Sequence, residues 1–152
     1  MFSLFKKKPL FTQAENQAII EAIRFAERRT SGEVRVYIEA KNAYMSPLDR
    51  AAELFFSLRM EETEHRNAVL VYIAVKHKEF ALFADKGIYE GAGTEFWNAE
   101  AAKMISKFSE AGLVEGICQC VKDIGEVLNS SFPYEANEDK NELPDEIVFG
   151  KI

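Results

Sequence analysis

An uninterrupted apolar run in the middle of the chain sets the first limit on the fold. Ala68 to Val75 places eight apolar residues in a row, and many of them are β-branched. Such side chains favour pleated, buried strands, so we predict a central β-strand here. Because no apolar run is longer and a membrane helix needs ~20 such residues, we expect no transmembrane segment.

The sequence on both sides of this run alternates between helical and strand patterns. Thr12 and Glu15 form a capping box before residues at helical spacing, and Ser46-Pro47 opens a second helix in a similar way. The glycines from Gly87 to Gly93 indicate a loop. The other predicted elements are a strand over 33–39, a loop over 61–66, a strand over 79–85, and helices around 97–108 and 113–128.

These elements predict an α/β fold in the order α-β-α-β-β-α-α, with a small mixed β-sheet sandwiched between helices. Glu33 to Glu39 alternates apolar and polar residues, so we expect one face of that strand to be less deeply buried. If the first two strands are parallel and the third returns antiparallel, Glu33, Asn67 and Asp85 gather at one sheet edge.

Charge divides the chain into three parts. Residues 1–10 form a basic N-terminal arm of charge +3, residues 11–132 form the α/β domain with −5, and residues 133–152 form an acidic, loop-like tail with −4. A largely acidic domain offers little cationic surface to phosphates, so we expect no nucleic-acid partner. Met1 to Lys8 combines apolar residues with three lysines, which predicts weak peripheral contact with anionic membranes.

The cysteines and the N-terminus favour a cytoplasmic protein. Cys118 and Cys120 lie two apart on a predicted helix, where they point to different sides and do not bridge easily. We interpret them as buried structural thiols rather than as a metal site. The lysines of the N-terminal arm follow its apolar residues, the reverse of a secretory signal.

Three motifs together resemble the TPM domain, a family formerly described as a domain of unknown function. They are Thr30-Ser31-Gly32-Glu33-Val34-Arg35-Val36, Arg66-Asn67-Ala68-Val69-Leu70-Val71 and Asp85-Lys86-Gly87-Ile88-Tyr89-Glu90-Gly91. The resemblance covers roughly residues 11–132. It implies an α/β sandwich with a divalent-cation site beside the sheet.

Members of that family include a thylakoid-lumen protein described as an acid phosphatase, a photosystem repair factor and an accessory protein of an animal receptor. Many members carry a signal peptide and a membrane helix with a glycine-rich tail. We expect neither in this chain, so lumenal and membrane-anchored roles are not carried over.

The resemblance directs attention to Asp85 as a cation ligand. Carboxylate oxygens suit Ca²⁺ and Mg²⁺, and Asp85 follows a predicted strand. By the predicted topology its neighbours are Asn67, Glu33 and Glu90. The alternative is that Asp85 caps a turn and that Glu90 is a solvated acid.

Other polar and aromatic residues have more ordinary interpretations. Glu61, Glu62 and Glu64 read as a solvated acidic loop, and His65 and His77 as surface residues at opposite ends of the central strand. Arg35 and Arg66 would bind phosphate or pair with nearby carboxylates. Phe96 and Trp97 fit the core better than a ligand cleft.

The sequence therefore predicts a divalent-cation-binding TPM module, with Ca²⁺ or Mg²⁺ as cofactor and an accessory or sensing role toward an unknown protein partner. The alternatives are a metal-dependent phosphatase and a metal-independent protein-interaction domain. No G-x-S-x-G, P-loop, H-E-x-x-H or C-x-x-C motif is present, so the catalytic residues are unknown.

Overall fold

A computed structural model describes residues 10–42, 45–108, 112–134 and 146–151. Residues 1–9 of the basic arm, including the Met1 to Lys8 segment of the predicted membrane contact, lie outside these residues. The helices are α1 (Gln13–Glu27), α2 (Pro47–Ser57), the 3₁₀ helix η2 (Met60–Glu62), α3 (Lys86–Ala92), α4 (Thr94–Lys107) and α5 (Leu113–Ser131). The strands are β1 (Glu33–Glu39), β2 (Ala68–Ala74), β3 (Glu79–Ala84) and β4 (Val148–Phe149).

The strands form one mixed sheet in the order β3-β2-β1-β4. β1 runs parallel to β2 and to β4, while β3 runs antiparallel to β2. The predicted parallel and antiparallel pairings are therefore confirmed. The apolar run forms β2, and every one of its seven strand residues is buried.

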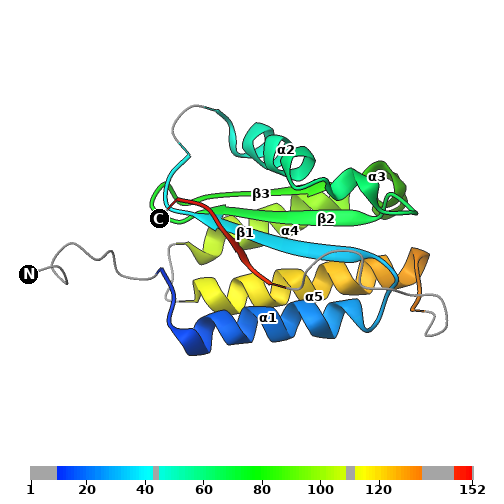
Figure 1. The fold of residues 1–152 in the computed structure, drawn as a ribbon, viewed down its shortest axis with the longest axis horizontal. Coiled ribbons are helices and arrows are strands. Elements are labelled where there is room, and N and C mark those ends of the chain that lie inside the picture. Colours follow the sequence, from blue (N-terminus) through cyan, green and yellow to red (C-terminus); the bar gives the residue numbers. More distant parts are fainter. Residues whose placement is uncertain (1–9, 43–44, 109–111, 135–145, 152) are drawn as a thin grey trace, which may run out of the picture.

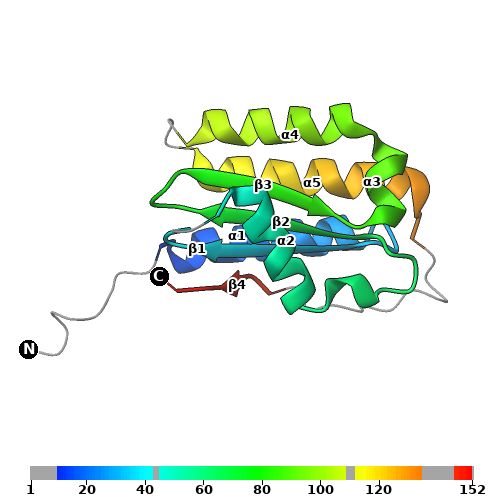
Figure 2. The ribbon, with the colours of Figure 1, turned by 90° about the horizontal axis from the view of Figure 1, so that it is seen from above.

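Helices cover both faces of the sheet, which confirms the predicted α/β sandwich. Figure 1 shows α2 on one side and α1 and α5 on the other, and Figure 2 shows that α4 lies beside α5. The α1–α5 side holds the larger core, which includes Val34, Val69 and Ile124. The α2 side holds a smaller core around Phe55, Leu70 and Tyr72.

Two predicted loops contain an α-helix or a β-strand, and residues 61–62 of a third belong to η2. The glycine-rich segment forms α3, because the Asp85 side chain accepts a hydrogen bond from the Lys86 N–H and Ile88 is buried against the core. The C-terminal tail was expected to be loop-like, yet Val148 and Phe149 pair with β1. The loop interpretation is wrong at both places, because capping and tertiary pairing outweigh local composition.

The strand β1 is buried on both faces, which corrects the expectation of a less buried polar face. Its seven residues are all buried, including Glu33, Arg35 and Glu39. The polar residues alternate with the apolar residues of the α1–α5 core, so they lie on the opposite face of the sheet, where Glu39 meets Arg50 of α2 and the Tyr72 hydroxyl. The Glu39 carboxylate accepts hydrogen bonds from Arg50 Nε at 2.9 Å, from Arg50 Nη2 at 3.0 Å and from the Tyr72 hydroxyl.

These hydrogen bonds keep Glu39 ionised. Burial works against its charged form, but the hydrogen bonds from Arg50 and Tyr72 outweigh burial and hold the pKa of this carboxyl below its usual range. Burial, followed by the hydrogen bond to Glu39, raises the pKa of Tyr72. The buried acid is thus satisfied as a hydrogen-bonded ion pair.

No helix within the described residues is long and apolar enough to cross a membrane. Both cysteines are free on α5, where Cys120 is buried and Cys118 is half-buried. Trp97 packs in the core with Phe96 against it. The core interpretation of this aromatic pair is confirmed.

Candidate functional site

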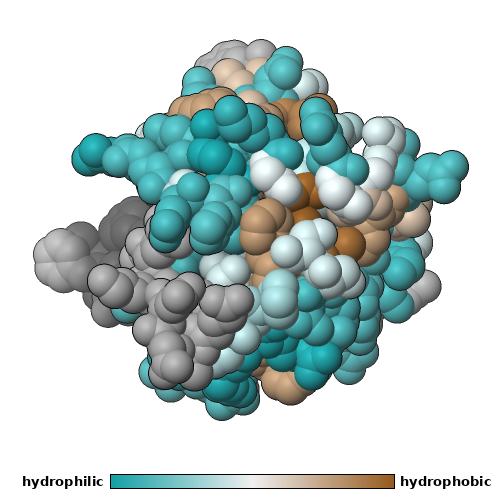
Figure 3. Space-filling view, turned by 90° about the vertical axis from the view of Figure 1, so that its right-hand side faces the viewer, coloured by the Kyte–Doolittle hydropathy of each residue, from teal (hydrophilic) through white to brown (hydrophobic). Residues whose placement is uncertain are grey.

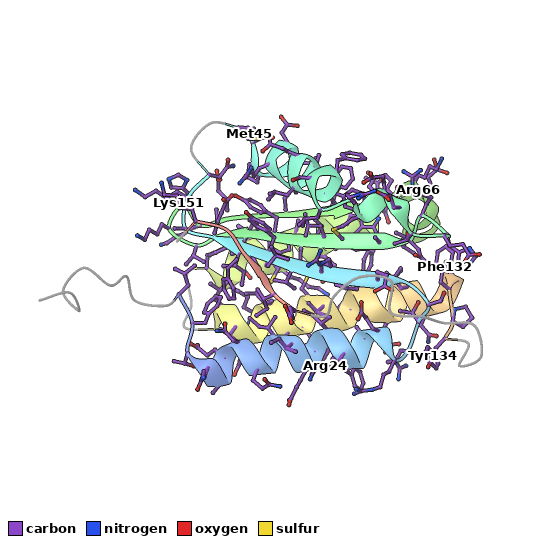
Figure 4. The ribbon with its side chains drawn as sticks, viewed as in Figure 1. Arg24, Met45, Arg66, Phe132, Tyr134 and Lys151 are labelled. Atoms are coloured by element: carbon purple, nitrogen blue, oxygen red, sulfur yellow. The ribbon has the colours of Figure 1, made fainter. Side chains whose placement is uncertain are left out.

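The sheet register brings Glu33, Asn67 and Asp85 to one edge, as predicted. Glu33 lies opposite Ala68, and its N–H donates to the Asn67 carbonyl at 3.3 Å. The Asp85 N–H donates to the Ala68 carbonyl at 2.9 Å. The starts of β1 and β2 and the end of β3 therefore meet at one place, which Figure 4 marks with Arg66.

The Asp85 carboxylate is buried and fully engaged. Its residue is only 4% exposed, and its two oxygens accept from Arg66 Nε at 2.6 Å and from Arg66 Nη2 at 2.9 Å. A third hydrogen bond, from the Lys86 N–H at 2.8 Å, caps α3. Arg66 pairs with a carboxylate, as predicted, and Asp85 is a capping residue, although it caps the helix α3 rather than a turn in a loop.

The Arg66 guanidinium is more open than its partner, with 36% of its side chain exposed. The hydrogen bonds to Asp85 are the main reason that the pKa of Arg66 is raised, and the charges of Asp85 and Glu61 add to the effect. The Arg66 backbone is in the left-handed region with φ 51°. Its carbonyl accepts from the Gly87 N–H at 2.8 Å, which joins the turn before β2 to α3.

Asn67 shares this edge but lies on the other face of the sheet. Side chains alternate along a strand, so Asn67 falls on the side of Val69, which packs in the larger core. Ala68 belongs to the core under α2. Asn67 is 0% exposed, and neither Oδ1 nor Nδ2 of its side chain has a hydrogen-bond partner among the described residues.

Glu90 is not brought to the other predicted ligands. It lies exposed on α3, and five helical positions after Asp85 turn it about 140° around the axis. A loop, as predicted, would have let Glu90 fold back toward Asp85. The helix α3 does not allow this.

Glu61, a carboxylate that the sequence analysis did not assign to the site, acts electrostatically on Arg66. It lies on η2, contributes to the raised pKa of Arg66, and buries an Oε2 atom that has no hydrogen-bond partner within the described part of the chain. The acidic run was interpreted as a solvated loop, which fits Glu62 but not Glu61. The only signal in the sequence was that the run directly precedes the central strand.

Few side-chain oxygens among the described residues are available at this edge to bind a cation. Within residues 10–42, 45–108, 112–134 and 146–151, no group of three or more His, Cys, Asp or Glu side chains is placed to share one metal ion. A cation bound here would use Asp85 and Glu61, with water or carbonyl oxygens completing its shell. Mg²⁺ commonly binds in this way, through one or two carboxylates.

The two histidines lie at opposite ends of β2, as predicted. The His65 ring packs against Phe132, with ring centroids 6.1 Å apart. His77 lies next to Asn42, whose backbone N–H donates to Nδ1 at 3.1 Å. They cannot act as a pair on one substrate.

The end of the molecule that carries this edge is seen face-on in Figure 3. Hydrophilic residues surround a smaller central area of neutral and hydrophobic residues.

Comparison with known proteins decides the family. The TPM domain matches residues 5–127, which is most of the chain. The chain belongs to the TPM domain family. No curated protein matches this chain.

Two solved structures share the fold of this TPM protein. The BA42 protein from the psychrophilic bacterium Bizionia argentinensis is 35% identical with a TM-score of 0.86, over 95% of this chain and 99% of that one. The N-terminal domain of the cg2496 protein from Corynebacterium glutamicum is 11% identical with a TM-score of 0.55, over 86% of this chain and 90% of that one. The similarity to the cg2496 domain is therefore a similarity of fold alone.

Proposed function

We propose that this TPM domain is a divalent-cation-binding module with an accessory or sensing role toward a protein partner. The observation that supports the proposal is the buried Asp85 carboxylate at the sheet edge, beside Arg66 and the carboxylate of Glu61. A buried carboxylate requires a positive partner. Arg66 is that partner in this structure.

The same geometry makes Arg66 a competitor of the cation. Arg66 Nε and Nη2 occupy both oxygens of Asp85, so a cation would bind after the guanidinium swings out. Arg66 is half-exposed and can turn toward solvent, whereas Asp85 stays fixed by the Lys86 N–H. A bound Ca²⁺ or Mg²⁺ would supply the positive charge that Arg66 withdraws.

A titration with Ca²⁺ and with Mg²⁺, followed by backbone amide NMR, tests the proposal. We expect shifts at residues 60–62, 66–68 and 85–88, with α5 largely unaffected. Asp85→Asn keeps a good capping residue but removes the charge, and should abolish these shifts. Arg66→Gln removes the competitor and should tighten cation binding about ten-fold, equivalent to about 1.4 kcal/mol.

Glu90→Gln is the matched control, because it removes one acid from α3 away from Arg66, and cation affinity should stay unchanged. Shifts confined to the acidic tail would show that the site is misplaced. No response to either cation would favour a metal-independent interaction domain. Equal affinity in wild type and Arg66→Gln would contradict the competition.

A turnover assay tests the phosphatase alternative. We expect the purified protein with saturating Mg²⁺ or Ca²⁺ to hydrolyse a generic phosphate monoester slowly or not at all. Such hydrolysis needs a positioned nucleophile and charge stabilisation together, but Asp85 is engaged in its ion pair and the His65 ring lies against Phe132. Turnover of about 1 s⁻¹ or more that is lost in Asp85→Asn and with chelator would establish the phosphatase instead.

A further inference from the structure

A groove between α1 and α5, on the side of these helices away from the sheet, gathers positive charge. Its volume is about 660 Å³, and its lining includes Arg24, Arg28 and Lys122, together with Glu21, Phe25 and Cys118. Figure 1 shows α1 and α5 side by side along their length. They approach closely because Gly125 has no side chain, since a Cβ there would lie 2.7 Å from the Cβ of Ala26.

The charge of this groove is opposite to that of the whole chain. Three cations and one acid line it, whereas the protein carries a formal charge of −6. Cations near the C-terminus of a helix stabilise its dipole, which accounts for Arg24 in the last turn of α1 and Arg28 at its C-cap. Lys122 lies in the middle of α5, where the helix dipole gives no reason for a cation.

The rest of the lining is apolar. Phe25 is 43% exposed, and Lys122 Nζ lies 6.0 Å from the centre of its ring. Burial raises the pKa of the Cys118 thiol, so this thiol is neutral at pH 7 and adds no negative charge. Charged and apolar parts therefore lie next to each other in one groove.

We propose that the groove between α1 and α5 binds a small organic phosphate. The guanidinium groups of Arg24 and Arg28 and the ammonium of Lys122 would bind the phosphoryl oxygens through charge-assisted hydrogen bonds. Phe25 and the neutral Cys118 would contact the organic part of the ligand. The volume is that of an ordinary small-molecule pocket, roughly 300–1,000 Å³.

The chemistry of the lining selects this ligand class. Inorganic phosphate would make no apolar contact with Cys118 or with the Phe25 ring, which lies against the cationic groups of Arg29 and Lys122. A nucleic acid would need a broad cationic surface, which a single groove on an acidic chain does not supply. Glu21 opposes any anion, so it limits affinity and provides a sharp test.

The proposal is independent of the cation site, because none of its residues belongs to the sheet edge. Its test therefore uses the full-length protein with chelator present. The probe is phenylphosphonate, which cannot be hydrolysed as a phosphate monoester, and inorganic phosphate is the head-group-only comparison. We expect amide shifts at residues 18–28 and 118–122, and tighter binding of phenylphosphonate than of phosphate.

Charge variants give the quantitative result. The double variant Arg28→Gln with Lys122→Gln should bind phenylphosphonate about ten-fold or more weakly, because it loses two charge-assisted contacts. Glu21→Gln should bind more tightly than wild type. Lys41→Gln, an exposed cation after β1, is the control and should leave affinity unchanged.

Three outcomes would overturn the proposal. The first is a double variant that folds, by its amide spectrum, and keeps wild-type affinity. The second is equal weakening by Lys41→Gln, which would mean that the anion responds only to net charge. The third is binding of a glutamate-rich peptide in this groove without binding of phenylphosphonate, which would assign it to an acidic protein segment.

Discussion

Replacing Arg50 with alanine should lower the free energy of unfolding by about 3 kcal/mol or more, the range measured when one partner of a buried ion pair is removed. Glu39 is 4% exposed, and Arg50 supplies two of its hydrogen bonds. Without Arg50, a buried carboxylate keeps only the Tyr72 hydroxyl. The variant also loses the exposed pair of Arg50 with Glu53, which contributes little.

Chemical denaturation of wild type and variant measures this effect. The control is Arg59→Ala, which breaks the exposed pair with Glu62 and should cost at most about 1 kcal/mol. A similar small loss in Arg50→Ala would show that water reaches Glu39 and that the network is not buried in solution.

The pH dependence follows from the sign of the Glu39 shift. Its folded pKa is below the unfolded value of about 4.3, so this group stabilises the protein above that pH and the contribution is lost as the pH falls through the folded pKa. In Arg50→Ala, burial favours the neutral acid. The stability difference between the two proteins should therefore be largest near pH 7 and shrink below about pH 4.

Gly87→Ala should also be strongly destabilising, by about 3 kcal/mol, at the upper end of the usual cost of overpacking. A Cβ at Gly87 would collide with the backbone carbonyl oxygens of His65 and Arg66. Neither carbonyl can rotate away alone, because both belong to the turn that leads into β2. The substitution would push α3 off this turn and strain the Arg66–Asp85 pair.

Thermal unfolding should show a loss of roughly 6–12 °C for a protein of this size. Gly112→Ala is the control, because no atom lies within 4 Å of a Cβ built at Gly112 and its φ of −119° suits any residue. A Gly87→Ala protein as stable as wild type would mean that the turn shifts freely. In that case Asp85 would not be held rigidly enough to select a cation.

Local pattern was sufficient to predict three strands of the sheet but not the edge strand β4. The run from Ala68 to Val75 identified β2, and the alternation over 33–39 identified β1, because both carry strong strand propensity. Val148 and Phe149 form β4 only through pairing with Tyr37 and Ile38. A strand of two residues is too short to show a periodic pattern in the sequence, so the formation of β4 depends on tertiary contacts.

The sequence predicted where the candidate site lies, but only some of the residues in it. Topology alone placed Asp85 and Asn67 at one edge, since parallel strands begin together. Which face each side chain takes depends on register, and this separated Asn67 from Asp85. The place of Glu61 depends on a single turn of 3₁₀ helix, whose sequence differs little from that of a solvated loop.

The short strand β4 also covers part of the edge of β1. Hydrogen bonds from the Gly150 N–H to the Ile38 carbonyl and from the Ala40 N–H to the Lys151 carbonyl occupy backbone groups along β1. Without them, a strand rich in valine and isoleucine would present an open edge to other chains, which is a template for aggregation. The segment from Val148 to Lys151 thus covers this part of β1, which would otherwise be open to pairing with another chain.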